Sequence, residues 1–80
     1  MEVPWKERAF AVYREAFAEL IERWLGKQPP PDVEFFVEEI KEALLDLKFA
    51  VINEQSTSAG TYGEEVLILL FELRLRSPEP

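Results

Sequence analysis

Residues 64–76 read EEVLILLFELRLR, and this stretch decides the expected fold. When alternate positions are assigned to opposite sides, one side carries Leu67, Leu69, Phe71, Leu73 and Leu75. The other side carries Val66, Ile68 and Leu70, followed by the charged residues Glu72, Arg74 and Arg76. Such alternation is typical of a β-strand. Because the first half is apolar on both sides, we expect both of its sides to be covered.

The chain has 80 residues and contains neither cysteine nor histidine. The absence of cysteine excludes disulfides, thiolate nucleophiles and cysteine-based zinc sites. The absence of histidine excludes imidazole acid–base chemistry and the histidine-containing catalytic triads. We therefore expect no catalytic residue, no cofactor and no metal site, and we expect that the protein is not an enzyme. The length suits one domain over residues 1–80.

The formal net charge is −7, from 16 acidic and 9 basic residues. This excess of acid predicts no direct binding to nucleic acid and no attraction to anionic membranes. The longest apolar run, residues 66–71, is too short to span a bilayer. Residues 1–10, MEVPWKERAF, carry charges where a secretory signal needs apolar residues. We therefore expect a cytoplasmic protein.

Residues 4–25 show the apolar spacing of a helix, with Pro4 in its first turn and Gly26 just beyond its end. Glu19 and Arg23 are spaced as a favourable ion pair on that helix. Two interpretations of its aromatic side chains remain open, namely core packing or a groove for an apolar ligand or a partner helix. The aromatic residues are Trp5, Tyr13, Phe17 and Trp24. Beside this stripe, on one flank, lie Phe10, Phe17 and Ile21.

Residues 28–31 form a stiff connector, and Asp32 is a suitable N-cap for a second helix over residues 32–47. Phe35 and Leu45 fall outside the apolar face of that helix. Its acidic residues are spaced at three and four positions, which favours a solvated helix face over a site for a divalent cation. These acidic residues are Glu34, Glu38, Glu39 and Glu42.

Residues 48–54, KFAVINE, are interpreted as a first strand, although an extension of the second helix to Asn53 is the alternative. Residues 55–63, QSTSAGTYG, are expected to be a mobile polar loop. This loop lacks the lysine and the following helix that a phosphate-binding loop needs, so it is either a plain connector or a contact surface for another protein. Residues 77–80 are expected to be a frayed tail.

The expected fold class is α+β, with two antiparallel helices packed on a C-terminal β-hairpin (ααββ). A two-stranded sheet is marginal alone, so we expect a second copy to extend it into a four-stranded sheet within a two-fold dimer. Glu72, Arg74 and Arg76 would then protect the strand edge or orient a partner. The candidate interface residues are Phe10, Phe17, Ile21, Phe35, Leu45, Val66, Ile68, Leu70, Glu72 and Arg74. Six of them are expected to have no place within one chain, namely Phe10, Phe35, Leu45, Val66, Ile68 and Leu70.

The functional prediction is a small acidic protein-interaction module that acts as a homo-oligomer and that serves as an accessory subunit, adaptor or inhibitor. Its predicted partners are a second copy of itself and another protein. A rival hypothesis is an acidic decoy that blocks a nucleic-acid-binding surface on another protein, since its charge would steer association. Two further hypotheses are a domain that binds a small apolar ligand and a designed chain without a biological role.

Overall fold

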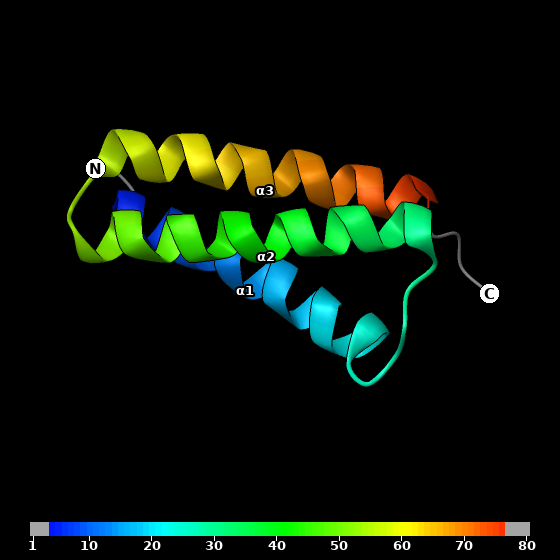
Figure 1. Cartoon of the computed structure of the whole chain (residues 1–80). Helices are drawn as coiled ribbons and strands as arrows, with labels where there is room; N and C mark the ends of the chain where they lie inside the picture. The colour runs from blue at the N-terminus through cyan, green and yellow to red at the C-terminus, as the bar shows by residue number, and fades with distance from the viewer. Residues whose placement is uncertain (1–3, 77–80) are drawn as a thin grey trace.

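The computed structural model describes residues 4–76, which form three α-helices. Helix α1 spans Trp5–Trp24, α2 spans Pro31–Ile52 and α3 spans Ser56–Arg76. No strand occurs in this part of the chain. Helices α2 and α3 lie side by side and antiparallel, whereas α1 crosses them at an angle (Figure 1). The predicted α+β fold with a C-terminal β-hairpin is therefore wrong, and the protein is a three-helix bundle. Without a strand, the four-stranded sheet across two copies is also excluded.

The buried residues of the third helix are spaced alternately four and three positions apart. Its buried residues are Ala59, Gly63, Val66, Leu70 and Leu73. This spacing keeps one seam of a helix against its neighbours. This spacing starts within residues 55–63, at Ala59 and Gly63. Both residues are small and lie among polar residues, so the sequence pattern does not identify them as core positions. The predicted loop over 55–63 and the predicted strand over 64–76 are therefore both wrong.

The outer side of α3 is also apolar, which explains why this segment also fits the two-residue repeat of a β-strand. Large side chains on that outer side are exposed, namely Leu67, Ile68, Phe71 and Leu75. With both the seam and the outer side apolar, residues 66–71 form one continuous apolar run. Periodicity alone cannot assign such a run to a strand or to a helix.

Helix α2 is longer at both ends than the predicted helix over residues 32–47. Its buried positions continue from Val33 to Ala50, so the predicted strand over 48–54 is wrong. The alternative interpretation, a helix extended toward Asn53, is close to what the structure shows. At the start, Pro31 occupies the first helical position and Pro30 is the N-cap, in place of the predicted Asp32. Proline suits that position because its fixed φ is helical and its missing N–H would have no partner there.

A turn of three residues, 53–55, joins α2 to α3. The N–H of Gln55 donates to the carbonyl of Ala50 at 2.9 Å, and the N–H of Glu54 donates to the carbonyl of Val51 at 3.1 Å. This pair of hydrogen bonds is the Schellman motif, which needs a left-handed residue after the helix. Glu54 takes that conformation, with φ 60°. The tight turn holds α2 and α3 antiparallel.

Helix α1 ends at Trp24, and Gly26 follows with φ 73°, which confirms Gly26 as the predicted residue after the helix. The N-terminal half of α1 packs closely on the bundle because the small side chains of Ala9, Ala50 and Ala59 meet there, in a cluster with Leu47. Larger side chains, including Leu20 and Leu44, fill the other end. The C-terminal half of α1 therefore diverges from the other two helices, and residues 25–30 span the gap (Figure 1).

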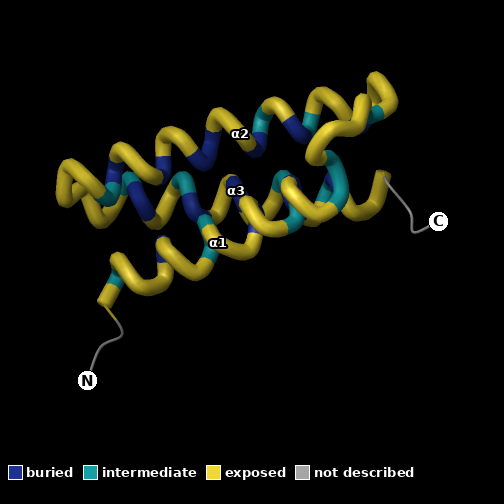
Figure 2. Tube along the Cα trace, turned by 90° about the horizontal axis from the view of Figure 1, so that it is seen from below, coloured by how far each residue is buried: buried dark blue, intermediate teal, exposed yellow. Residues whose placement is uncertain are grey.

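The core lies along the line where the three helices face one another. Buried positions recur about once per turn on the inner sides of the helices, and most other positions are exposed (Figure 2). The largest fully buried side chains are Val33, Ile40, Leu47, Val66, Leu70 and Leu73. The predicted tail, residues 77–80, lies outside the described residues.

Candidate interaction surface

A hollow follows the line between α1 and α2, and we call it the α1–α2 groove. Its larger part has a volume of 560 Å³ and lies between the diverging half of α1 and the start of α2. Its smaller part has a volume of 310 Å³ and lies between the start of α1 and the end of α2. Tyr13 lines both parts, so the two parts meet at that ring. The groove therefore runs along most of the α1–α2 contact.

The shape of the groove follows from the sequence. Because α1 diverges, the side chains of Leu20, Val37 and Leu44 form a floor that no fourth element covers. Residues 26–29 of the connector line the wide end. The sequence left open whether the four aromatic residues Trp5, Tyr13, Phe17 and Trp24 form a core or line a groove. Three of them, Tyr13, Phe17 and Trp24, line the wide part. Trp5 lines neither part of this groove, and it packs beside the small-residue cluster instead.

Three predicted interface residues form the α1 wall of this groove. Phe10, Phe17 and Ile21 are 60, 48 and 41% exposed. The guanidinium of Arg14 lies over the ring of Phe10 at 4.9 Å. Opposite Phe10, the α2 wall ends in Ile52, which is also exposed. This wall is thus an apolar edge that the chain itself leaves open to solvent.

The structure places the remaining predicted apolar residues in three different environments. Phe35 and Leu45 are exposed on α2 but line neither part of the α1–α2 groove. Ile68 is exposed on the outer side of α3, away from the core. Val66 and Leu70 are 0 and 1% exposed, packed in the core of the same chain. The prediction that these last two have no place within one chain is therefore wrong.

Several exposed apolar residues were missing from the predicted set. They are Leu25, Phe49, Ile52, Leu67, Phe71 and Leu75. Helical spacing would have identified those of α3, because a repeat started at Ala59 leaves Leu67, Phe71 and Leu75 off the seam. Phe49 and Ile52 were hidden by the strand interpretation of residues 48–54. The exposed apolar surface is therefore larger than the sequence pattern indicated.

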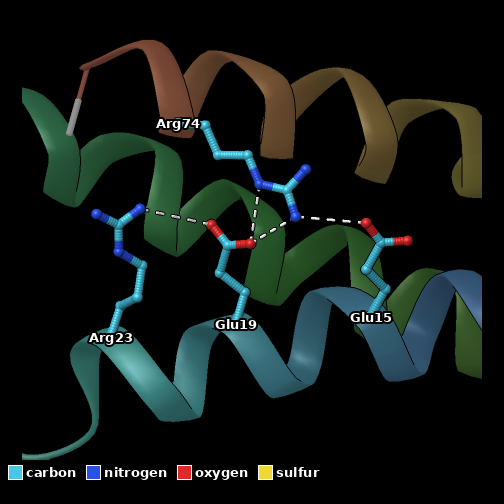
Figure 3. A network of polar contacts seen from close by, with 4 residues as sticks. All are labelled: Glu15, Glu19, Arg23 and Arg74. Atoms are coloured by element: carbon cyan, nitrogen blue, oxygen red, sulfur yellow. Dashed lines mark hydrogen bonds and ion pairs between the residues drawn. The ribbon is translucent and has the colours of Figure 1, made fainter. Parts of the chain in front are cut away.

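Arg74 and Glu72 take part in ion pairs within the bundle. Arg74 on α3 binds Glu19 and Glu15 on α1, and the second oxygen of Glu19 lies 3.8 Å from Arg23 (Figure 3). The Glu19–Arg23 pair confirms the predicted spacing. The hydrogen bond to Glu19 raises the pKa of Arg74 above its ordinary value. Glu72 pairs with Arg76 one turn further along α3. Protection of a strand edge by these charges is excluded, because α3 is a helix.

Residues 4–76 contain no group of three or more acidic side chains placed to hold a metal ion. In the acidic row of α2, Glu38 pairs with Lys41 at 3.3 Å. One polar group beside the groove stands out: the Nε1–H of Trp24 is buried and donates to no acceptor in the described part of the chain. Trp24 thus carries an unpartnered donor next to the wide end, covered from solvent.

None of the three described helices is long and apolar enough to cross a membrane. Comparison with known proteins gives no further guide, since the chain matches no protein-family model, no curated protein and no solved structure.

Proposed function

We propose that the protein is a non-enzymatic protein-interaction module that associates with a second copy of itself. One observation supports this proposal: within residues 4–76, twelve large apolar side chains are at least 41% exposed. They occur on all three helices. Soluble monomers rarely expose contiguous apolar patches larger than a few hundred Å², and larger patches mark interaction sites. We include a cytoplasmic location in this proposal.

The energetics favour association through such a surface. Full burial of one large apolar side chain contributes about 1.5–3 kcal/mol. Association costs an estimated 4–15 kcal/mol in lost translational and rotational freedom. Phe10, Phe17 and Ile21 are already about half buried, so covering them on both copies contributes about 4–9 kcal/mol, which offsets the lower part of that cost. The net charge of −7 opposes association unless opposite charges meet at the interface.

Sedimentation velocity over a range of micromolar concentrations tests the proposal. We expect a species of twice the 9.3 kDa chain mass that dissociates on dilution. Replacement of two exposed residues, Phe10→Ser with Phe17→Ser, should weaken the dimer while circular dichroism still shows a helical fold. The matched control is Ile68→Ser with Phe71→Ser, which changes the outer side of α3 instead. A single 9.3 kDa species at every concentration would rule out self-association.

A second candidate function is the binding of a small apolar ligand with a hydrogen-bond acceptor at one end. The buried, unpartnered Nε1–H of Trp24 favours it, and so does the volume of the wide part of the groove, which lies within the common range for ligand sites. Displacement of a fluorescent apolar dye by medium-chain fatty acids measures such binding. Trp24→Phe keeps an aromatic ring and removes the donor, so it should weaken binding severalfold. No displacement by any member of the series would exclude this candidate.

A further inference from the structure

We propose that the second copy packs its own α1–α2 groove against this one, turned end for end. The two-fold axis then lies in the interface and runs across the helices. Helix α2 of one copy lies antiparallel to α2 of the other, and the two α1 helices are related in the same way. This inference rests on the proposed self-association and specifies its face and its symmetry.

Charge is distributed unevenly along the groove. Lys6 and Lys48 line the narrow end, and no acidic side chain lines that end. Both acidic residues that line the groove, Glu34 and Glu38, lie at the wide end. Pairs within the chain occupy part of these charges, since Lys6 is paired with Glu54 at the narrow end and Lys41 with Glu38 at the wide end. Lys27 of the connector also lines the wide end.

Among the charges that α2 contributes to the groove, two are available to a second copy. Within residues 4–76, neither Lys48 nor Glu34 has an ion-pair partner. They are 14 residues apart on α2, which equals two heptads, so both point to the same side of the helix. The distance between them along the axis is about 21 Å. Antiparallel α2 helices therefore place Lys48 of each copy at the acidic end of the other.

The direction of the two-fold axis follows from these charges. Two identical groove faces can meet around an axis along the groove or around an axis across it. An axis along the groove would keep the two narrow ends together, so Lys48 of each copy would lie over Lys6 of the other, and like charges that face each other are unfavourable. An axis across the groove places each lysine beside an acid. The charge pattern therefore selects the end-for-end arrangement.

The same rotation covers the exposed apolar wall of α1. Phe10 lies in the first half of α1, so Phe10 of one copy lies over the C-terminal half of α1 of the other. Phe17, close to the middle, lies near the axis. Each wall can then fill the open floor of the opposite groove. Because both copies use the same surface, the contact closes as a dimer and leaves no copy of this surface free.

Charge reversal tests the arrangement. Lys48→Glu places an acid beside the acids of the second copy, and Glu34→Lys places a lysine beside Lys48 of the second copy. We expect each single variant to weaken the dimer by about tenfold or more, measured as the dissociation constant by sedimentation. An equimolar mixture of the two variants should regain wild-type affinity, because every facing pair is again of opposite charge.

Glu34→Lys distinguishes the proposed pairing of Lys48 with Glu34 from the general repulsion between two acidic chains. It lowers the net negative charge, so general repulsion alone would make its dimer tighter, whereas the proposed pairing makes the dimer weaker. The control is Asp46→Lys, which makes the same charge change on α2 but lines neither part of the groove. Circular dichroism verifies the helical fold of each variant. If Lys48→Glu does not fold, Lys48→Gln takes its place and should weaken the dimer to a smaller extent.

The outcomes distinguish this inference from the proposed function. A wild-type chain that stays monomeric overturns both. A dimer that tolerates each single reversal, or whose mixed variants do not regain affinity, overturns the groove arrangement and leaves self-association intact. If Ile68→Ser with Phe71→Ser abolishes the dimer while the reversals do not, the interface is the outer side of α3. Assemblies that grow beyond two copies would indicate a head-to-tail contact and would also overturn the inference.

Discussion

Arg74 on α3 donates two hydrogen bonds to one carboxylate oxygen of Glu19 on α1, from Nε at 2.9 Å and from Nη2 at 2.6 Å. The Glu19 side chain is only 13% exposed and lies between this arginine and Arg23. The contact joins α3 to the half of α1 that diverges from the bundle (Figure 3). A long-range ion pair thus supplements the packing of Ala16 and Leu20 on the core.

We expect Arg74→Ala to lower the free energy of unfolding by about 1 kcal/mol, because a shielded carboxylate then loses its hydrogen-bond donor. A larger effect is not expected, since the arginine itself is half exposed and solvent screens the pair. Urea denaturation followed by circular dichroism measures the change. Lys41→Ala, which removes an exposed pair within α2, should change the free energy of unfolding by less than about 0.5 kcal/mol. Equal effects of the two variants would contradict the structural role of Arg74.

Gly60→Ala and Gly63→Ala should each raise the free energy of unfolding by up to about 1 kcal/mol. Both glycines lie inside α3, where alanine is the better helix former. A methyl group at either position meets no atom within 4 Å, so the gain is not offset by a clash. Thermal unfolding measures the effect. If residues 55–63 were a loop, neither substitution would show this gain.

Gly26→Ala is expected to change stability in the opposite direction. Gly26 has φ 73°, a conformation that costs a residue with a side chain about 1 kcal/mol or more. The same thermal measurement therefore separates two kinds of glycine in one chain. A stabilising Gly26→Ala would contradict the described end of α1.

Leu70→Ala should lower the free energy of unfolding by about 2–5 kcal/mol, because removal of a fully buried side chain leaves a cavity. Ile68→Ala, two residues earlier, should cost less than about 1 kcal/mol in the monomer because Ile68 is 62% exposed. Urea titration at low protein concentration compares the two variants. A strand with both residues on one side would give similar losses, and that result would contradict the helix.

Glu54→Gly should stabilise the chain by about 0.5–1 kcal/mol. Glu54 occupies the left-handed position after α2, where glycine is preferred. The substitution also removes an exposed pair with Lys6, whose contribution is small. Glu54→Gln removes the same charge and keeps a side chain, so it isolates the backbone effect. If glycine and glutamine at this position gave the same stability, the left-handed conformation would carry no cost for a side chain.

The sequence predicted the first two helices because their apolar residues repeat with helical spacing and because Pro4 and Gly26 mark the ends of the first. The N-cap of the second was placed at Asp32, whereas the helix begins at Pro31. The Glu19–Arg23 pair was also predictable from spacing. The third helix was not predicted, because its outer side is as apolar as its buried side. Its buried positions also begin with two small residues, Ala59 and Gly63. Small residues carry little hydrophobic signal, so the polar residues around them indicated a loop.

The candidate surface was predictable only where a helix was recognised. Phe10, Phe17, Ile21, Phe35 and Leu45 lie off the apolar faces of their helices, and all five are exposed. Their role in an interface stays a prediction. On α3, the two-residue repeat of a β-strand predicted that Val66, Ile68 and Leu70 lie on the same side. In a helix, Ile68 lies about 200° around the axis from Val66, so it faces solvent while the other two are buried.

Helices α2 and α3 are joined by a turn of three residues, whereas α1 reaches them through a connector of six residues. Contacts between α2 and α3 are thus local, and local contacts cost little loop-closure entropy. We therefore expect this helical hairpin to form early during folding and α1 to dock late. In hydrogen exchange, the amides of the diverging half of α1 should then lose protection before those of α2 and α3, through partial opening that leaves the hairpin intact.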